Sequence, residues 1–220
     1  MTIHNIEGVK AVQNLGFSRA VLARELSFSE IAEICQNSNI EIEAFIHGAL
    51  CMSYSGRCLF SSMIGGRSGN RGKCAQPCRL PYELICEDKT IDKGYLLSPR
   101  DLCSLEYLPK LVHAGVKSFK IEGRMKKPEY TAGVVSIYRK YLDRYLANPK
   151  APYRVSEADK KHLLGLFNRK GFTDGYYTRH NGTSMITYTA PDFRAGEDVF
   201  LEKIRTDYIG TKLKENIKER

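Results

Sequence analysis

The first third of the chain alternates between segments of helical periodicity and short apolar runs. Residues 8–15 carry apolar side chains at helical spacing, and the four apolar residues 20–23 that follow Gly16 are typical of a buried strand. After a second helical segment, residues 40–46 form another run that is largely apolar. This alternation predicts an α/β domain with a parallel sheet.

Local signals mark the starts of the longer helices. Ser27 and Glu30 form the S-x-x-E pattern of a capping box, which predicts a helix that runs to about Cys35. Pro128 at a first helical position begins a long helix that runs to about Ala147. Six side chains share one face of that helix, so we expect them in the core. They are Tyr130, Val134, Ile137, Tyr138, Tyr141 and Tyr145.

The rest of the chain predicts shorter elements. Pro99-Arg100-Asp101 is expected to open a helix that runs to His113. A further helix is expected over residues 156–167. Strands are expected at residues 82–85, 95–97, 116–121 and 198–202. Three or four strand–helix units are therefore visible along the chain.

This number of units limits the fold. A closed (β/α) barrel needs eight units and about 250 residues, so the sheet cannot close on itself. Either the sheet is open, or the chain is an internal fragment of a longer protein. We expect residues 1–150 to be the C-terminal half of a TIM-type (β/α) barrel with a long cysteine-rich loop at residues 47–80. Residues 151–220 are expected to begin a small mixed α+β extension.

The chain is basic. Its 34 Lys and Arg against 25 Asp and Glu give a formal net charge of +9. This excess favours a polyanionic partner such as RNA, although a solubilising surface gives the same count. The sequence has no run of 18 apolar residues and no basic N-terminal region followed by an apolar stretch. We therefore expect a cytoplasmic protein with no membrane partner.

Seven cysteines are many for a protein in a reducing compartment, where disulfides are rare. Their clustering predicts metal or redox chemistry. Four thiolates are expected to reach one centre, because the glycine-rich segment 65–72 lets the backbone fold back between them. These are Cys51, Cys58, Cys74 and Cys78. Four-cysteine sites hold zinc or an iron–sulfur cluster, and the six residues between the first two cysteines favour a cluster.

Basic side chains follow the glycines of the same segment. Arg67, Arg71 and Lys73, with Arg79 nearby, are predicted to form a flexible cationic surface that binds phosphate or carboxylate groups. The alternative is a solvated loop without a ligand. These four residues are our candidates for contacts with an anionic substrate.

Charged residues also follow directly after two predicted strands. Arg24 and Glu25 follow residues 20–23, and Glu122 and Arg124 follow residues 116–121. Because active-site groups of (β/α) barrels lie just past the C-terminal ends of strands, we expect both pairs at the site. Ordinary ion pairs at the starts of the next helices are the alternative.

One histidine is a candidate as well. His47 lies beside the cysteine segment and is either a catalytic residue or the partner in a structural hydrogen bond. The other histidines form no constellation with it. The sequence has neither an H-E-x-x-H motif nor a G-x-S-x-G motif, so the common zinc-protease and serine-hydrolase sites are not indicated.

The densest motif is Glu43-x-Phe45-x-x-Gly48-Ala49-Leu50-Cys51, followed by Cys58 and by Cys74-Ala75-Gln76-Pro77-Cys78. It resembles the signature of the collagenase-like peptidase family, the thirty-second of the U-class of uncertain catalytic type. The resemblance continues through Ser98-Pro99-Arg100-Asp101-Leu102 and Lys120-Ile121-Glu122-Gly123-Arg124. Full-length members look like a complete barrel, which implies that this chain lacks their N-terminal strands.

The resemblance also implies a function, since bacterial members include tRNA uridine 5-hydroxylation proteins. We expect hydroxylation at C5 of the tRNA wobble uridine, with prephenate, a small dicarboxylate, as the hydroxyl source. A [4Fe-4S] cluster is the implied cofactor, with zinc as the alternative. Related members place their last cysteine differently, so Cys86 or Cys103 could replace Cys78 as the fourth ligand. Glu122 would act as acid or base, while Arg124 and Arg67 would hold anions.

Two other functions stay open. The family name implies a collagenase-like peptidase, with a metal-activated water or a cysteine as the nucleophile. No base is evident in the sequence beside any Ser or Cys, which disfavours that mechanism. The third interpretation is a non-catalytic RNA-binding module that is stabilised by a metal.

Overall fold

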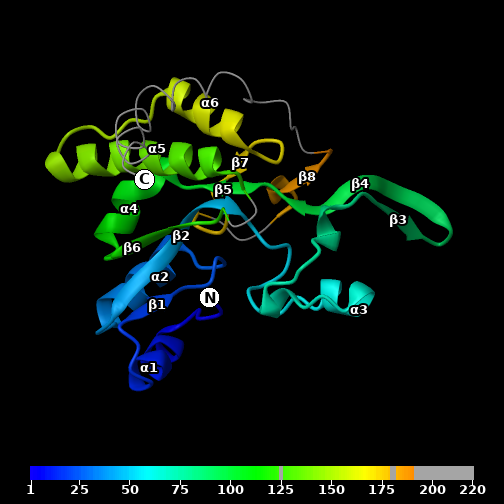
Figure 1. The fold of residues 1–220 in the computed structure, drawn as a ribbon, viewed down its shortest axis with the longest axis horizontal. Helices are drawn as coiled ribbons and strands as arrows, with labels where there is room; N and C mark the ends of the chain where they lie inside the picture. The colour runs from blue at the N-terminus through cyan, green and yellow to red at the C-terminus, as the bar shows by residue number, and fades with distance from the viewer. Residues whose placement is uncertain (124–125, 179–181, 191–220) are drawn as a thin grey trace, which may run out of the picture.

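The fold is known from a computed structural model, which describes residues 1–123, 126–178 and 182–190 (Figure 1). The helices are α1 (Ile6–Asn14), α2 (Phe28–Asn37), α3 (Phe60–Gly65), α4 (Leu108–His113), α5 (Pro128–Ala147) and α6 (Glu157–Leu166). The strands are β1 (Arg19–Val21), β2 (Glu41–Ala49), β3 (Tyr82–Cys86), β4 (Lys89–Pro99), β5 (Asp101–Cys103), β6 (Ser118–Ile121), β7 (Phe172–Thr173) and β8 (Ile186–Tyr188). The 3-10 helices are η1 (Gly69–Arg71), η2 (Pro77–Arg79), η3 (Leu105–Tyr107) and η4 (Thr183–Met185).

Parallel strands form the central part of the main sheet. β1 pairs in parallel with β2, and β2 pairs in parallel with β6 (Figure 1). On the outer side of β1, a parallel bridge joins Ile3 to Leu22, so residues 1–3 cover that edge. The parallel segments thus lie side by side in chain order, with helices between them. This is the arrangement that successive βα units produce.

A short antiparallel pairing extends the sheet at the C-terminal end of β2. There β2 pairs with β5, which in turn pairs in parallel with β7. Within the described residues the sheet remains open, because β6 lies beside β2 and pairs with no strand on its other side. The predicted α/β class is confirmed, and barrel closure is not seen in this part of the chain.

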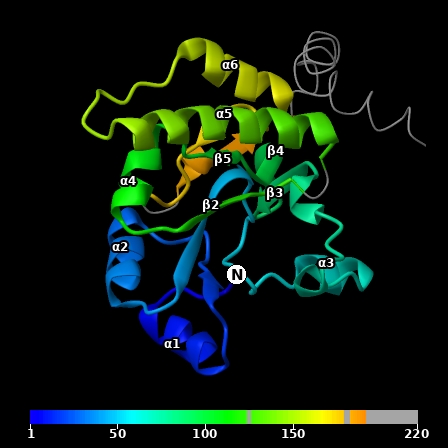
Figure 2. The same ribbon diagram turned by 60° about the vertical axis from the view of Figure 1, so that its left-hand side comes forward.

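The helices form a layer against the sheet. Contacts run from α1 to α2, from α2 to α4, from α4 to α5 and from α5 to α6, so the layer follows the chain order (Figures 1 and 2). Between the layer and the sheet lies one apolar core. Its most deeply buried members include Val9, Leu22, Ile31, Ile42, Leu105, Leu108, Leu111 and Val134.

The predicted helix starts of α2 and α5 are confirmed. The Glu30 amide donates to the Ser27 hydroxyl and the Ser27 amide donates to the Glu30 carboxylate, which completes the capping box. Pro128 begins α5, and all six side chains expected on its core face are buried. None of the described helices combines the length and apolar character that a membrane-spanning segment needs.

β3 and β4 form a hairpin that projects away from the main sheet (Figure 1). Glu87 and Asp88 connect the two strands with positive φ angles, the left-handed conformation that tight hairpin turns require. β4 is longer than the strand predicted at residues 95–97, and beyond the hairpin it pairs with β8. The hairpin therefore extends the cysteine-rich loop into a lobe of its own.

The helix predicted from Pro99 is wrong at its start. Asp101–Cys103 forms β5 because these residues pair with the end of β2, and the helix begins only at Leu108. A distant partner thus overrides the local preference at this position. The strand predicted at residues 198–202 lies outside the described residues. The predicted division at residue 150 stays a prediction, although α6 packs on α5.

Candidate functional site

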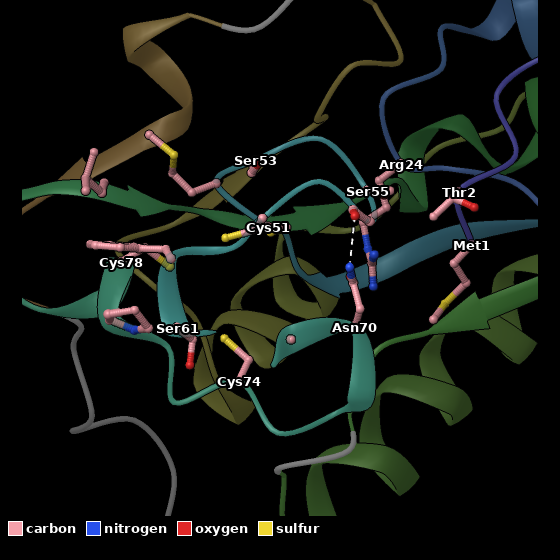
Figure 3. Close-up of a pocket in the computed structure, with 17 residues that line it drawn as sticks. Met1, Thr2, Arg24, Cys51, Ser53, Ser55, Ser61, Asn70, Cys74 and Cys78 are labelled. Atoms are coloured by element: carbon pink, nitrogen blue, oxygen red, sulfur yellow. Dashed lines mark hydrogen bonds between the residues drawn. The ribbon is translucent and has the colours of Figure 1, made fainter. Parts of the chain in front are cut away.

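Four of the cysteines line one pocket of about 730 Å³ (Figure 3). Cys51 follows the end of β2, and Cys58 precedes α3. Cys74 and Cys78 lie on the segment that returns towards the sheet and ends in η2. Arg24, from the end of β1, lines the same pocket. The pocket therefore combines the four thiols expected to share a centre with one cation from the sheet.

The loop between the first two cysteines is tied to the sheet and to the returning segment. Glu25 accepts hydrogen bonds from the Ser55 amide at 2.9 Å and from the Ser55 hydroxyl at 3.0 Å. The Asn70 side chain donates to the Gly56 carbonyl oxygen at 3.0 Å, as the dashed line in Figure 3 shows. Glu25, which was expected at the site, thus holds the cysteine loop through its carboxylate, and a contact with substrate stays a prediction.

The four thiols line one pocket, but they are not close enough together to bind a metal ion in this geometry. Burial raises the pKa of Cys51 and of Cys78, and the neighbouring cysteines add to both shifts. Within the described part of the chain, no three His, Cys, Asp or Glu side chains are close enough to hold a metal ion as they stand. The donor set nevertheless fits a thiophilic metal or cluster, because such sites reach their final geometry when the metal binds.

The remaining cysteines lie elsewhere. Cys86 ends β3 in the projecting hairpin and is exposed. Cys103 lies in β5 with its sulfur 3.6 Å from the Tyr138 hydroxyl. Cys35 is half-buried in α2, where burial raises its pKa to about 11. None of the three lines the pocket, so the structure separates both alternative fourth ligands, Cys86 and Cys103, from the other thiols.

Arg24 and Glu122 follow strands on opposite sides of β2 and form an ion pair, and of the two only Arg24 lines the pocket. Arg24 Nη2 donates to Glu122 Oε2 at 3.0 Å, and the guanidinium lies 3.7 Å from the centre of the Phe45 ring. Burial lowers the pKa of Arg24, which Glu122 partly offsets. The buried Arg24 Nε has no hydrogen-bond partner among the described residues. Arg124, the other expected member of this group, lies outside the described residues.

Gly48 allows the end of β2 to approach Glu122, the residue that follows β6. Its φ of +105° is a conformation that L side chains rarely adopt, and a Cβ there would collide with the Glu122 carbonyl oxygen. The Glu122 amide donates to the His47 carbonyl oxygen at 2.8 Å, which holds the two strand ends together. A glycine at this position therefore sets the place of Glu122 relative to the pocket.

We expect Gly48→Ala to destabilise the protein by at least about 2 kcal/mol, because backbone strain and overpacking add. The shift is measurable as a lower midpoint in urea denaturation. Gly65→Ala is the matched control, because no atom lies within 4 Å of the added methyl group and its backbone is not left-handed. Equal midpoints for the two variants would contradict the expected strain at Gly48.

His47 does not reach the pocket. Its side chain is buried between the rings of Tyr130, Tyr138 and Phe172, and its Nδ1 lies 3.2 Å from the Tyr138 hydroxyl. Burial lowers the pKa of His47 to about 3, so the ring is neutral at physiological pH. The geometry is that of a packed residue near one hydroxyl partner, and a catalytic role for His47 stays a prediction.

The basic residues of the loop divide into two kinds. Arg67, Arg71 and Lys73 are exposed, as expected for a cationic surface, and Arg67 Nε also donates to the Lys73 carbonyl oxygen. Arg79 departs from this picture, because its guanidinium points inward and donates to the Leu50 carbonyl oxygen. Burial and the nearby Arg169 lower the pKa of Arg79 to about 10.

A buried ionic cluster next to the site was missed from the sequence. Arg169 donates to Asp101, and both side chains are almost fully buried. Lys126 lies over the Phe167 ring, and burial together with Arg169 lowers its pKa to about 7. The one sequence signal is a charged residue, Asp101, in a motif that resembles the family signature, and its local pattern predicts a helix start.

The model of the family described as Peptidase family U32 matches residues 1–187. The chain belongs to peptidase family U32. Its relatives carry names from two kinds of chemistry, and no solved structure matches the chain. The region that matches the family model contains the four thiols, Arg24 and Glu122.

The relatives named for RNA hydroxylation include one from Bacillus subtilis and one from Escherichia coli. The chain is 44% identical to the tRNA hydroxylation protein P1 of Bacillus subtilis, over 68% of this chain and 37% of that protein. It is 36% identical to the 23S rRNA 5-hydroxycytidine C2501 synthase of Escherichia coli, over 95% of this chain and 33% of that protein. A third relative, the collagenase of Porphyromonas gingivalis, is 38% identical over 71% of this chain and 41% of that protein. The chain thus spans well under half the length of these relatives.

Proposed function

We propose that the chain is part of an enzyme that hydroxylates RNA. In its finer form, the proposal is that the enzyme hydroxylates C5 of the tRNA wobble uridine, with prephenate as the hydroxyl source. The observation that carries the proposal is the convergence of four thiols and Arg24 on one pocket. A four-thiolate set suits a redox centre, which hydroxylation needs and peptide hydrolysis does not. Two relatives with names for RNA hydroxylation support the substrate class.

Cys51, Cys58, Cys74 and Cys78 would hold a [4Fe-4S] cluster, which supplies electron transfer when it is bound. Zinc would fit four thiols as well, but it would give the site no redox chemistry. Arg24 would offer the donors that Glu122 does not use, such as the unpaired Nε, to a carboxylate group of a dicarboxylate such as prephenate, because guanidinium binds carboxylate through charge-assisted hydrogen bonds.

The half-barrel interpretation belongs to the same proposal. Parallel strands in chain order, each followed by a helix, are what half of a TIM-type barrel would contribute. The other half would come from chain that the longer relatives have and this sequence does not include. Arg24 and Glu122 would then lie at the C-terminal end of the barrel strands, where such enzymes carry their active sites.

The lobe that surrounds the pocket supports an RNA partner. Between Glu43 and Glu83 the sequence contains no Asp or Glu, while it contains five Arg and Lys residues. Four of these cations are exposed and have no ion-pair partner among the described residues: Arg57, Arg67, Arg71 and Lys73. Tyr54 and Met63 are also strongly exposed on the lobe, and an exposed aromatic ring offers a face on which a base can stack.

We expect the triple variant Arg57→Gln, Arg71→Gln, Lys73→Gln to bind tRNA about ten- to a hundred-fold more weakly, as expected for three partly screened phosphate contacts. The slope of log affinity against log salt concentration should fall by about 0.7 for each lost contact. Fluorescence anisotropy of labelled tRNA with the full-length protein measures both quantities.

The matched control changes three exposed cations that lie outside the lobe, Lys150→Gln, Arg154→Gln and Lys161→Gln, and so removes the same charge. It should keep an affinity close to that of the wild type. If the two triple variants lose affinity equally, RNA responds only to the net charge, and the lobe is no specific docking surface.

Peptidase activity has less support from the described residues. A cysteine or serine nucleophile needs a base beside it, and no histidine lines the pocket in the part of the chain that the structure describes. His47 is buried among aromatic rings, as described above. We therefore expect the purified full-length protein to leave gelatin uncleaved.

The test of the proposed function is mass spectrometry of tRNA nucleosides from a strain that lacks the gene. Loss of 5-hydroxyuridine derivatives, restored by the wild-type gene, would support the proposal. Unchanged nucleosides together with a loss of gelatin cleavage would overturn it in favour of the peptidase.

A further inference from the structure

One arginine connects the two halves of the thiol pocket. Arg79 follows Cys78 at the end of η2, and its Nη2 donates to the Leu50 carbonyl oxygen at 2.6 Å. Leu50 immediately precedes Cys51. The same guanidinium thus lies one residue from Cys78 in sequence and holds the backbone one residue from Cys51.

A third segment meets the same side chain. Arg79 Nη1 donates to the Ser98 hydroxyl at 3.0 Å and to the Pro99 carbonyl oxygen at the end of β4. Ser98 is fully buried, so these hydrogen bonds lie inside the protein. One guanidinium therefore ties together the start of the cysteine loop, its returning segment and the strand that leads back into the sheet.

Besides its packing on α3 and β4, the returning segment has few other side-chain hydrogen bonds among the described residues. The Ala75 amide donates to the buried Ser61 hydroxyl, and the Tyr82 hydroxyl donates to the Pro77 carbonyl oxygen. Both of these hydrogen bonds stay within the lobe. Among the side-chain hydrogen bonds of the described residues, only the one from Arg79 to the Leu50 carbonyl oxygen links residues 74–79 to the residue that follows β2.

We propose that Arg79 is a positioning residue that sets the spacing between Cys51 and Cys78 and supplies positive charge beside the centre they bind. The inference rests on the proposed function, since it assumes that these thiols bind a metal centre. A planar guanidinium with a fork of donors can hold several carbonyl oxygens at once, whereas a lysine ammonium cannot hold them in the same geometry. A cluster with four thiolates carries net negative charge, and nearby charge is one determinant of its potential.

The first experiment uses Co²⁺ as the probe in the metal-free full-length protein. Thiolate-to-cobalt absorption should report binding to the wild type, and Arg79→Gln should weaken that binding at least about ten-fold, the order of loss seen when outer-shell partners of metal ligands are removed. Arg79→Lys should show a smaller loss, because it keeps the charge but not the fork. Arg154→Gln changes an exposed arginine that does not line the pocket; it is the matched control and should bind as the wild type does.

The second experiment measures the reduction potential of the reconstituted centre. The potential should fall in Arg79→Gln and stay closer to the wild-type value in Arg79→Lys, because only the latter keeps the positive charge. A purely structural role would lower the yield of loaded protein without moving the potential of the fraction that loads. If Arg79→Gln does not fold by circular dichroism, the comparison of Arg79→Lys with the wild type decides, because cobalt affinity at the wild-type level would overturn the proposal.

The outcomes separate this inference from the proposed function. A wild-type protein that binds Co²⁺ through thiolates, with equal binding and equal potential in both Arg79 variants, would overturn the role of Arg79 alone. A wild-type protein that shows no thiolate-to-cobalt absorption and no cluster would overturn the metal centre itself, and the role of Arg79 with it.

Discussion

Full-length protein purified without oxygen is expected to be brown, with a broad absorption shoulder in the violet and blue, and Cys58→Ala is expected to be colourless. The reason is that Cys58 lines the pocket with three other thiols, and a cluster that loses one of four thiolates is no longer held. RNA hydroxylation should disappear with the colour. Absorption spectra, iron and sulfide analysis and tRNA nucleoside analysis measure these effects.

Cys86→Ala is the matched control for this experiment. Cys86 is exposed at the end of β3 and does not line the pocket, so its replacement should leave the colour and the hydroxylation unchanged. A colourless wild-type protein with one zinc ion per chain would contradict the redox mechanism, because zinc has no redox chemistry. If Cys58→Ala kept the colour and Cys86→Ala lost it, the cluster ligands would not be the four thiols of the pocket.

Glu122→Gln is expected to lower the rate of RNA hydroxylation by about a hundred- to ten-thousand-fold, the usual contribution of a general acid or base. The Glu122 carboxylate meets Arg24, which lines the pocket, and its side chain is 31% exposed, so a proton can pass to or from it. Glutamine keeps an oxygen that accepts from Arg24 but cannot move that proton. The affinity for tRNA should therefore remain within about two-fold of the wild type.

Single-turnover rates and tRNA affinities of the full-length protein test this expectation, with cluster content measured first. Glu106→Gln is the control, because Glu106 forms an exposed ion pair with Lys160. Wild-type rates in Glu122→Gln would show that Glu122 and Arg24 are a structural ion pair. A parallel loss of tRNA affinity would instead assign Glu122 to substrate binding.

Elements that depend on neighbours in the chain were predictable from the sequence. The capping box of Ser27 and Glu30 joins residues three positions apart, and Pro128 acts on its own helix, so both starts were found. β5 was missed because its partner, the end of β2, is distant in sequence. The antiparallel pairing with β2 determines the conformation of Asp101–Cys103, and the local sequence of that segment does not predict this pairing.

The site shows the same division. The four cysteines could be grouped from their spacing, because no other residue type in the segment binds metals so readily. The inward turn of Arg79 could not be predicted, because an arginine in a glycine-rich loop looks the same whether it faces water or a buried carbonyl. The pairing of Asp101 with Arg169 joins residues 68 positions apart and leaves no local pattern.

The cysteine lobe leaves and re-enters the sheet at one place, because Ala49 at the end of β2 pairs with Asp101 at the start of β5. The thiol loops, α3 and the projecting hairpin all lie between these two neighbouring residues (Figure 1). An excursion with adjoining ends can change in length or composition at small entropic cost and without displacing the strands beside it. The sheet and its helices can therefore form first, and the lobe can order afterwards as a local event.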